Sequence, residues 1–517
     1  MSDAVDRGIT VTEMAPMDEP IQVSPETTVA FVGRALRGPL NQPVLVQSFG
    51  EYRRRFGDVW TRSSLGPAVR QFFEHGGQRL YVVRVANGAR GAMLCLPASG
   101  SALVLRARQP GSTETLRAAV DYDGIDPDND ELFNLTLQRV DPSSGLVSDQ
   151  EILRAVSYRE GTDDFVGKRL LTSALASVET PLPGRRPECS NAAGSSTGAA
   201  YIDQVQQGSD GQELSDYDLV GSRMDETGLF SLQQIERLDL LYLPSPGKSR
   251  DLGPTSLLAA GLYCRERGAM LIVDPAASWV TPEKAVAGVR DLGMASPNTL
   301  AYFPRMYARH AVDDPPRAVG GALAGLLCKL DREYGAWNRL ADSPLGLSRE
   351  FVPAFDTDKD DLHLLVREGL NVVVEGAAGK ARVEGSVTLG RGSEEHRRFA
   401  SLHVRRLYLQ VVNAVRRGTR WAVFERDDER LAERIRSQVT AYLAALSNLG
   451  AFENDRFVVN CDAGVSHRAD DLDRGVTVLV IFHPAGCSEP VSFTLHQTVA
   501  GSRITSTAFA PVMEDCA

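Results

Sequence analysis

Short apolar runs alternate with helical patterns near the start of the chain. Residues 27–33, 43–46 and 80–85 are β-prone runs, and the apolar residues of 65–73 follow the spacing of one helix face. Continuous apolar runs are typical of strands that are buried on both faces of a sheet. This order of elements predicts an α/β fold for residues 25–90.

The same pattern returns after residue 225. Strands are expected at 238–244, 269–274 and 301–303, and helices at 256–267, 282–292 and 318–328. Thr281 followed by Pro282 is a good start for one of these helices, because threonine caps and proline fits the first helical position. Strands that alternate with such helices predict a mixed sheet, so we join 226–365 to 25–90 in one core domain.

Residues 91–225 have a different pattern. Short alternating segments, such as 103–105 and 133–137, are separated by turn-rich stretches, and 184–211 is rich in glycine and serine. This pattern predicts a mostly β insertion domain with long loops. We expect this domain on the outside of any assembly.

Amphipathic helices and a final group of β-prone segments mark the last part of the chain. One helix presents apolar residues from Val404 to Val415 and another from Leu431 to Leu446. Strands are expected at 457–459, 477–482 and 491–495. We assign 366–499 to a C-terminal α/β domain and 500–517 to a tail. The predicted fold class is therefore α/β, with a mixed-sheet core, a β-rich insertion and a C-terminal α/β domain.

The first 24 residues are predicted to form an extended arm. Prolines interrupt them, and Ile9 and Val11 form an alternating apolar pattern. Such a segment gains order by adding as a strand to another chain, and a frayed terminus is the alternative. The acidic start lacks the apolar centre of a signal peptide. The sequence contains no run of about 18 apolar residues, so we expect no membrane span.

The chain is acidic overall but contains one basic region. The formal net charge is −11, which argues against a nucleic-acid partner. Between Arg397 and Arg436, eleven arginines outnumber five acidic residues, so we expect a local surface for an acidic partner. Seven scattered cysteines without a CxxC pair predict neither a disulfide framework nor a thiolate zinc site.

Catalytic and cofactor motifs are missing from the sequence. Asp274 ends a predicted strand and Ser466 precedes His467, but there is no GxSxG, and a carboxylate at a strand end more often caps the next turn. A calcium loop started at Asp126 would lack its glycine and its final glutamate. No glycine motif for nucleotides and no paired histidine spacing occur, so we predict no cofactor and no metal.

Several long segments carry no such chemistry, yet their order is informative. They are TTVAFVGRALRGPLNQPVLVQSFGEYRRRFGD from Thr27, LGPAVRQFFEHGGQRLYVVRV from Leu65, DLVGSRMDETGLFSLQQIERLDLLYLP from Asp218 and VTLGRGSEEHRRFASLHVRRLYLQVVNAVRRGTRWAVFERDDERL from Val387. In order and spacing they resemble the contractile tail sheath family. The last segment, with its Arg-Arg-Leu helix and Trp-x-Val-Phe-Glu strand, is the most similar, whereas 383–389 and 426–428 depart from the family pattern.

The resemblance implies a structural subunit rather than an enzyme. Such subunits polymerise as stacked hexameric rings around an inner tube and contract to drive the tube through a target envelope. The implied partners are other copies of the chain, the tube protein, and the baseplate and tail terminator or cap proteins, without nucleic acid or membrane insertion. Assembly in the bacterial cytoplasm is implied, and a phage tail, a tailocin and an extracellular injection system all remain open.

The two chain ends are the expected joints between subunits. Val491, Phe493 and Leu495 alternate with polar residues as in an edge strand, beside which Ile9 and Val11 could pair. Main-chain hydrogen bonds hold such a joint without depending on side-chain packing, so it can persist while other contacts change. These five residues are our candidates for strand exchange between subunits.

Four arginines are candidates for contact with the tube: Arg426, Arg430, Arg434 and Arg436. Arg430 and Arg434 are one helical turn apart beside the apolar face of the Leu431–Leu446 helix. Charges at the rim of an interface set its register without binding strongly, which suits a contact that must break. A solvated helix face with local Glu–Arg pairs is the alternative, of equal weight.

Two other functions remain compatible with the sequence. An α/β hydrolase-like enzyme with an accessory β domain predicts a concave pocket with titratable side chains. A monomeric binding module would use the insertion at 91–225.

Overall fold

The computed structural model divides the chain into two compact units. The core unit comprises Thr27–Leu330 and Leu340–Ala400, and the C-terminal unit comprises Met1–Glu26, Asp331–Arg339 and Ser401–Ala517. The structure describes residues 20–141, 144–190, 200–247, 250–311, 313–376, 379–392, 397–424, 429–462, 475–487, 489–498 and 501–505.

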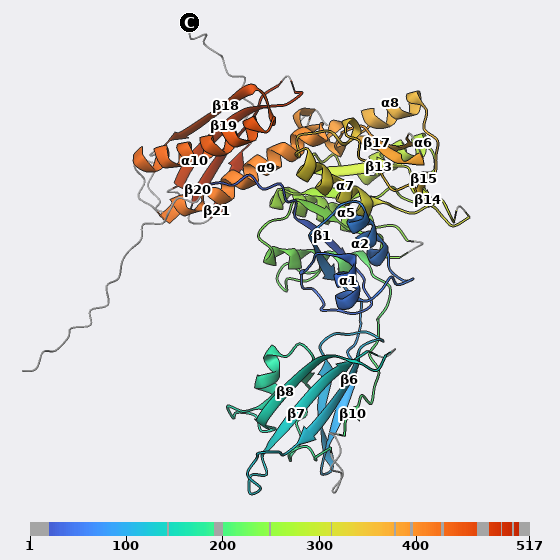
Figure 1. Cartoon of the computed structure of the whole chain (residues 1–517), viewed down its shortest axis with the longest axis vertical. Helices are drawn as coiled ribbons and strands as arrows, with labels where there is room; N and C mark the ends of the chain where they lie inside the picture. The colour runs from blue at the N-terminus through green and yellow to red at the C-terminus, as the bar shows by residue number, and fades with distance from the viewer. Residues whose placement is uncertain are drawn as a thin grey trace, which may run out of the picture. The chain divides into compact units, whose positions relative to one another are not determined.

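An eight-stranded sheet forms the centre of the core unit (Figure 1). Its strands are β1 (Val29–Gly33), β2 (Val44–Val46), β3 (Leu80–Arg84), β11 (Leu240–Tyr242), β12 (Met270–Val273), β13 (Thr299–Phe303), β16 (Leu370–Glu375) and β17 (Ala381–Glu384). The order is β17-β16-β13-β12-β11-β1-β3-β2, in which β2 and β17 are antiparallel to their neighbours and the other strands are parallel. β1, β11, β12 and β13 are buried along their whole length, and the predicted α/β fold class is confirmed.

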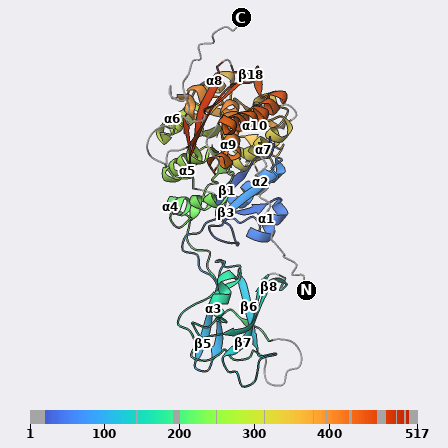
Figure 2. The same ribbon diagram turned by 90° about the vertical axis from the view of Figure 1, so that its left-hand side faces the viewer.

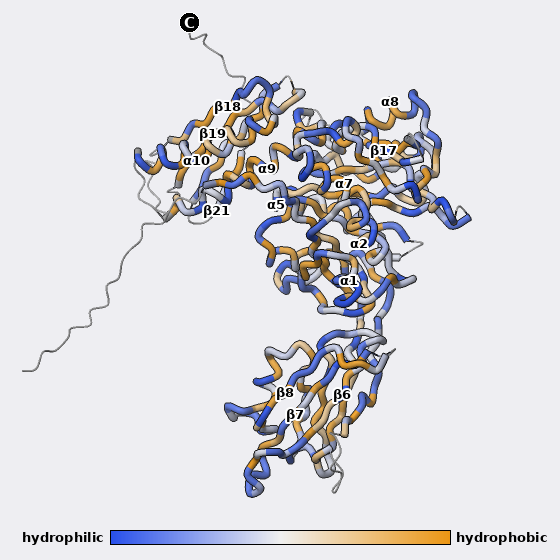
Figure 3. Tube along the Cα trace, viewed as in Figure 1, coloured by the Kyte–Doolittle hydropathy of each residue, from blue (hydrophilic) through white to orange (hydrophobic). Residues whose placement is uncertain are grey.

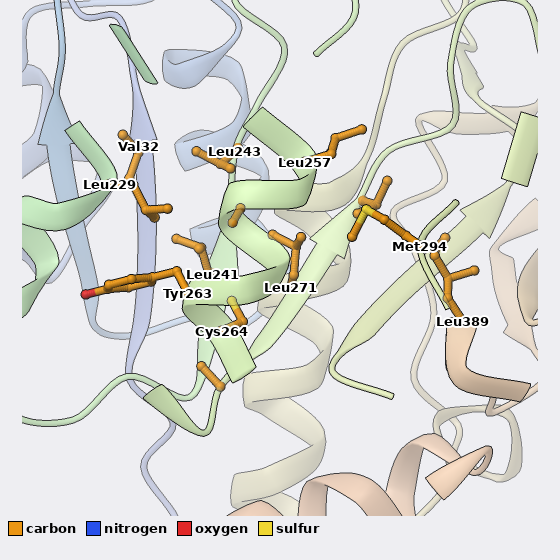
Figure 4. Packing of buried hydrophobic residues seen from close by; sticks show 14 of the residues in the cluster. Val32, Leu229, Leu241, Leu243, Leu257, Tyr263, Cys264, Leu271, Met294 and Leu389 are labelled. Atoms are coloured by element: carbon orange, nitrogen blue, oxygen red, sulfur yellow. The ribbon is translucent and has the colours of Figure 1, made fainter. Parts of the chain in front are cut away.

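Helices cover both faces of this sheet. They are α1 (Phe49–Phe56), α2 (Leu65–Glu74), α4 (Asp216–Val220), α5 (Pro254–Arg267), α6 (Pro282–Leu292), α7 (Gly320–Glu333) and α8 (Lys359–Arg367), with the 3₁₀ helices η2 (Gly228–Gln234), η3 (Leu340–Asp342), η5 (Leu389–Gly392) and η6 (Arg397–Phe399). One face of the sheet is covered by α4, α5, α6, α8 and η2. The buried cluster between these helices and the sheet includes Val32, Leu241 and Leu257 (Figure 4). On the other face the ring centroids of Phe31 and Phe72 of α2 are 5.6 Å apart. α7 is among the more apolar helices (Figure 3).

The core unit extends further along the chain than predicted. β16 pairs in parallel with β13, and β17 pairs with β16, so the boundary expected at residue 366 moves to residue 400. The hydrophobic pattern of β16 does not reveal this, because its partner is far away in the sequence. A small hairpin of β14 (Met306–Ala308) and β15 (Phe351–Pro353) also belongs to this unit.

A β-rich insertion occurs between β3 and β11, as the sequence predicts. Its elements are β4 (Met93–Ala98), β5 (Ser101–Ala107), β6 (Thr115–Asp121), β7 (Leu132–Val140), β8 (Val147–Ser157), α3 (Val166–Arg169), η1 (Leu170–Thr172), β9 (Ala176–Val178) and β10 (Ile202–Asp203). The strands form one sheet of order β10-β6-β7-β8 and another of order β4-β5-β9. Leu94 and Leu105 of one sheet and Phe133 of the other belong to one buried cluster, so the two sheets form a sandwich (Figure 2).

Arg84 at the end of β3 fixes the loop that follows β1. Its side chain is 2% exposed and donates hydrogen bonds to the carbonyl oxygens of Ala35 (3.0 Å), Leu36 (3.3 Å), Gly38 (2.6 Å) and Pro110 (2.7 Å). Burial lowers the pKa of this guanidinium to about 10. Because each of the three guanidinium nitrogens donates to at least one carbonyl, the loop is held rigidly between β1 and the insertion.

The C-terminal unit combines two long helices with an antiparallel sheet. Its elements are α9 (Leu402–Gly418), η7 (Arg420–Phe424), α10 (Glu429–Asn448), β18 (Phe452–Asp462), β19 (Gly475–Pro484), β20 (Val491–Thr498) and β21 (Gly501–Thr505). The sheet has the order β18-β19-β20-β21. Alternate residues of β19 are buried, and the ring centroids of Phe493 in β20 and Tyr408 in α9 are 5.9 Å apart. Within the described part of the chain, no helix has the length and apolar character needed to cross a bilayer.

Candidate functional site

Helix α10 carries the described arginines that the sequence selects for the tube contact. Its apolar face is at most 2% exposed at Leu431, Ile435, Val439, Leu443 and Leu446. Arg430 and Arg434 are one turn apart beside this face, as predicted. The face packs inside the C-terminal unit, so the arginines lie at the border between buried and accessible residues.

The arginines of α10 differ in their surroundings. The guanidinium carbon of Arg434 is 4.6 Å from the ring centroid of Trp421 in η7, a cation–π contact. Arg436 donates from Nη2 to the carbonyl oxygen of Cys461 in β18 at 3.1 Å. Arg430 is exposed and has no ion-pair partner among the described residues. Arg430 is therefore the most available of the three, and Arg426 lies outside the described residues.

The basic stretch from Arg397 to Arg436 is not one continuous charged surface. Burial lowers the pKa of Arg405 to about 10, and its guanidinium carbon is 5.0 Å from the ring centroid of Tyr408. Arg406 pairs with Asp331 at 2.5 Å, and both side chains are at most 8% exposed. These arginines serve the interior of the unit, so the excess of arginine overstates the charge that a partner can reach. A count of charged residues cannot distinguish arginines that pack inside the unit from arginines that a partner can reach.

β20 is not the edge strand that we predicted. Leu495 pairs with Val478 of β19 on one side and with Ile504 of β21 on the other. Val491, Phe493 and Leu495 are buried, which accounts for their alternation with polar residues. The pattern that suggested an edge strand instead reflects packing of one sheet face, and the described edges of this sheet are β18 and β21.

The two edges differ in their readiness to accept another strand. β18 contains a register shift between Phe452 and Phe457, where Asn454 and Asp455 have positive φ angles of 52° and 54°. Such a bulge disrupts the ladder and protects an edge. β21 is short and mostly exposed, with a regular register to β20. The β21 side of the sheet is therefore the more regular template.

The arm meets the C-terminal unit at its described base. A Cβ atom added to Gly418, at the end of α9, would stand 2.3 Å from Cγ1 of Ile21. Glycine is required there because the chain of the arm passes so close to the helix. The sequence gives no signal for this contact, since a glycine at a helix end is common on conformational grounds alone. Ile9 and Val11 lie outside the described residues.

Asp274 is the one carboxylate of the hydrolase hypothesis that the structure describes. Its Oδ2 accepts a hydrogen bond from Tyr242 Oη at 2.6 Å and its Oδ1 one from Tyr302 Oη at 2.8 Å. Burial raises the pKa of Asp274 to about 6. Tyr302 Oη in turn accepts from the backbone N of Val319 at 2.7 Å. This arrangement joins three strand ends to the start of α7, rather than capping the next turn as we expected.

The other expected catalytic and metal features give no site. Ser466 and His467 lie outside the described residues. In the described ranges, no group of three or more His, Cys, Asp or Glu side chains is placed to hold a metal ion. Sequence reasoning missed Tyr242 and Tyr302, which lie near the carboxyl ends of β11 and β13, on either side of the strand that Asp274 follows.

Comparison with known proteins identifies this architecture. Residues 394–494 match the family model described as the phage tail sheath C-terminal domain. The whole chain is similar to the sheath tail protein from Listeria innocua, with a TM-score of 0.62, 15% identity and coverage of 92% of this chain and 96% of that one. The search of curated protein sequences gave no significant match.

Two assembled sheaths are also similar in fold. The helical sheath of the anti-feeding prophage in its contracted state has a TM-score of 0.52 and 15% identity, with coverage of 94% of this chain and 98% of that one. The sheath complex of an extracellular contractile injection system, PVC, in its contracted state has a TM-score of 0.51 and 13% identity, with coverage of 99% and 97%. The predicted resemblance to contractile tail sheath proteins is thereby confirmed.

Proposed function

We propose that this chain, which has the fold of contractile tail sheath proteins, is the structural subunit of a contractile sheath. It polymerises as stacked hexameric rings around an inner tube and contracts to drive the tube through a target envelope. The observation that carries this proposal is a sheath fold over nearly the full length of both chains, with the C-terminal sheath domain matched within it. Near-complete coverage favours a shared architecture over one borrowed domain.

Strand exchange at the chain ends holds neighbouring subunits together. Val491, Phe493 and Leu495 anchor the receiving sheet, because their side chains are buried within their own unit. β21, which pairs with β20 in a regular register, is the edge strand that receives a strand from a neighbouring subunit. Ile9 and Val11 of the arm supply the alternating apolar pattern of that incoming strand. Main-chain bonds of this kind tolerate rotation between the joined bodies.

The charged end of α10 faces the tube. Arg430 supports this proposal best, because its charge is exposed and has no partner among the described residues. Arg434 is oriented by Trp421, and Arg426 comes from the preceding segment. The further partners are the baseplate and the tail terminator or cap proteins, and assembly occurs in the bacterial cytoplasm before the particle acts outside the cell.

A mechanical rather than catalytic role follows. Both carboxylate oxygens of Asp274 are already engaged by tyrosine hydroxyl groups, so this buried group has the surroundings of a structural brace. In a contractile polymer the energy is stored in a metastable packing of subunits and released when the rings rearrange. The hydrolase alternative would require a substrate pocket around this carboxylate.

Electron microscopy of the purified full chain tests the proposal. We expect negative-stain images to show striated tubes when the chain is concentrated alone or mixed with its tube protein. Sedimentation should place most of the protein in the pellet under the same conditions. Small uniform particles in both samples would contradict the proposal and favour an enzyme or a monomeric binding module.

A further inference from the structure

Arginines line a cavity at one side of the core unit. The cavity, of about 510 Å³, lies where the end of α1 meets the loop after β1. Its wall includes Arg37, Arg53 and Arg54 together with Asp58 and Asp141. Arg37 and Arg54 also line a neighbouring cavity of about 1130 Å³, to which Arg108 contributes. The loop is fixed in place by Arg84, so this arginine-lined cavity is part of the rigid frame of the unit.

One of these arginines, Arg54, keeps bonding capacity for an additional acceptor. Arg37 donates from Nη2 to the carbonyl oxygens of Arg53 (3.4 Å) and Arg54 (3.0 Å), and its Nε, which has no acceptor in the described structure, is buried. Arg54 is exposed and forms no ion pair with a described residue. Arg53, in contrast, is paired with Asp58 at 2.8 Å. A carboxylate that reached this cavity would therefore find at least one guanidinium without a competing partner.

A segment with the opposite charge lies in the same unit. Residues 356–361 contain four aspartates and one lysine, at the start of α8. Asp358 caps the helix by accepting from the backbone N of Asp361 at 2.8 Å. Asp356 and Asp360 are exposed and form no ion pair with a described residue. Burial and the charges of nearby carboxylates raise the pKa of Asp361, so the acidic groups of this segment repel one another.

Both surfaces lie at the carboxyl ends of parallel strands of the central sheet, but beside different strands. The cavity borders the loop that leaves the carboxyl end of β1, where the backbone N of Arg37 donates to the carbonyl oxygen of Phe56 at 3.1 Å. The acidic segment is at the carboxyl end of β13, because the ring centroids of Phe303 and Phe355 are 5.8 Å apart. β11 and β12 separate these strands in the sheet.

We propose that residues 356–361 of one copy dock on the arginine-lined cavity of the next copy around a ring. This inference deepens the proposed function and rests on it. A ring of identical subunits joins two different surfaces of the chain head to tail. The arginine-lined cavity and residues 356–361 are two such surfaces, and their charges are complementary. The contact sets the register between neighbours, while strand exchange supplies cohesion.

Two charge-reversal variants test the contact. One carries R53E and R54E, and the other carries D356K and D360K; Asp358 is left intact because it caps α8. We expect each variant to remain a folded monomer by circular dichroism and gel filtration. Each should raise the critical concentration for polymerisation about tenfold or more, because like charges would meet at every ring contact. A one-to-one mixture should polymerise near the wild-type concentration, since alternating copies restore opposite charges.

Matched controls reverse the same number of exposed charges elsewhere. R154E with R265E, and D123K with D128K, should polymerise like the wild type. Normal polymerisation of both test variants, or no recovery in the mixture, overturns the docking contact. A wild-type chain that never polymerises with its tube overturns the proposed function instead, so the two failures are distinguishable.

Discussion

The carboxylate of Asp274 ties three parallel strands to the first turn of α7. The two tyrosine hydroxyl groups that contact it come from β11 and β13. Gly320 is needed beside it, because a Cβ atom there would stand 2.4 Å from the Tyr242 ring and 2.6 Å from Asp274 Oδ1. The close approach of α7 thus depends on one glycine and one buried acid.

The protonation of Asp274 should make the unfolding free energy of the monomer depend on pH. Its folded pKa of about 6 is above that of an unfolded aspartate, near 3.9. The stabilising contribution of this group is therefore complete below about pH 4 and is lost as the pH rises through 6. Relative to D274N, we expect the wild type to gain about 1 kcal/mol of unfolding free energy between pH 7 and pH 5. Urea denaturation of both proteins measures this, and parallel pH profiles would contradict it.

Reversal of charge on α10 should uncouple the sheath from its tube. R430E with R434E replaces two positive charges at the proposed tube contact by negative ones. We expect empty or contracted sheaths in micrographs of co-assembled particles, because the register with the tube is lost while joints between subunits remain. R154E with R265E is the control for total charge. Extended, tube-filled particles from the α10 variant would favour a solvated helix face.

At the level of elements, the sequence predicts local periodicity well and distant partners poorly. The apolar face of α10 and the cap of α6 by Thr281 are local patterns, and both are found in the structure. The partners of β20 are not local, since burial against α9 produces the alternation that was assigned to an edge strand. The contact of Arg434 with Trp421 needs the turn between α9 and α10, which no periodicity defines.

The N-terminal arm can be divided experimentally into two parts. Residues up to 19 precede the described structure, whereas Ile21 packs against Gly418 in the C-terminal unit of its own chain. Deletion of 1–19 therefore removes Ile9 and Val11 but keeps the contact of Ile21. Deletion of 1–24 removes both.

We expect the chain without residues 1–19 to be as stable as the wild type and unable to polymerise. Its strand for the neighbouring sheet is missing, while its own packing is intact. The chain without 1–24 should show the same defect and a lower melting temperature, because the buried contact at Gly418 is also lost. Thermal denaturation and sedimentation separate the two effects. Normal sheaths from the shorter deletion would refute strand exchange by the arm.

At the scale of the whole molecule, we propose that cohesion and register depend on different physical interactions. Strand exchange uses main-chain hydrogen bonds, which are short-ranged and little affected by salt. The proposed contacts of the arginine-lined cavity and of Arg430 use exposed charges, which salt screens. A contracting lattice needs joints that persist and contacts that change, and our proposals assign the two kinds of interaction to different elements of the chain.

Ionic strength should therefore alter the packing of a sheath without dissolving it. At about 1 M salt the Debye length falls to about 3 Å, so charge contacts across a ring lose most of their strength. We expect wild-type polymers to remain in the pellet on sedimentation, while the helical order in micrographs is lost or changed. The chain without residues 1–19 provides the comparison, and it should stay in the supernatant at low and at high salt because it lacks the strand for its neighbour. Wild-type polymers that dissociate into monomers in salt would show that charge, and not strand exchange, holds the subunits together.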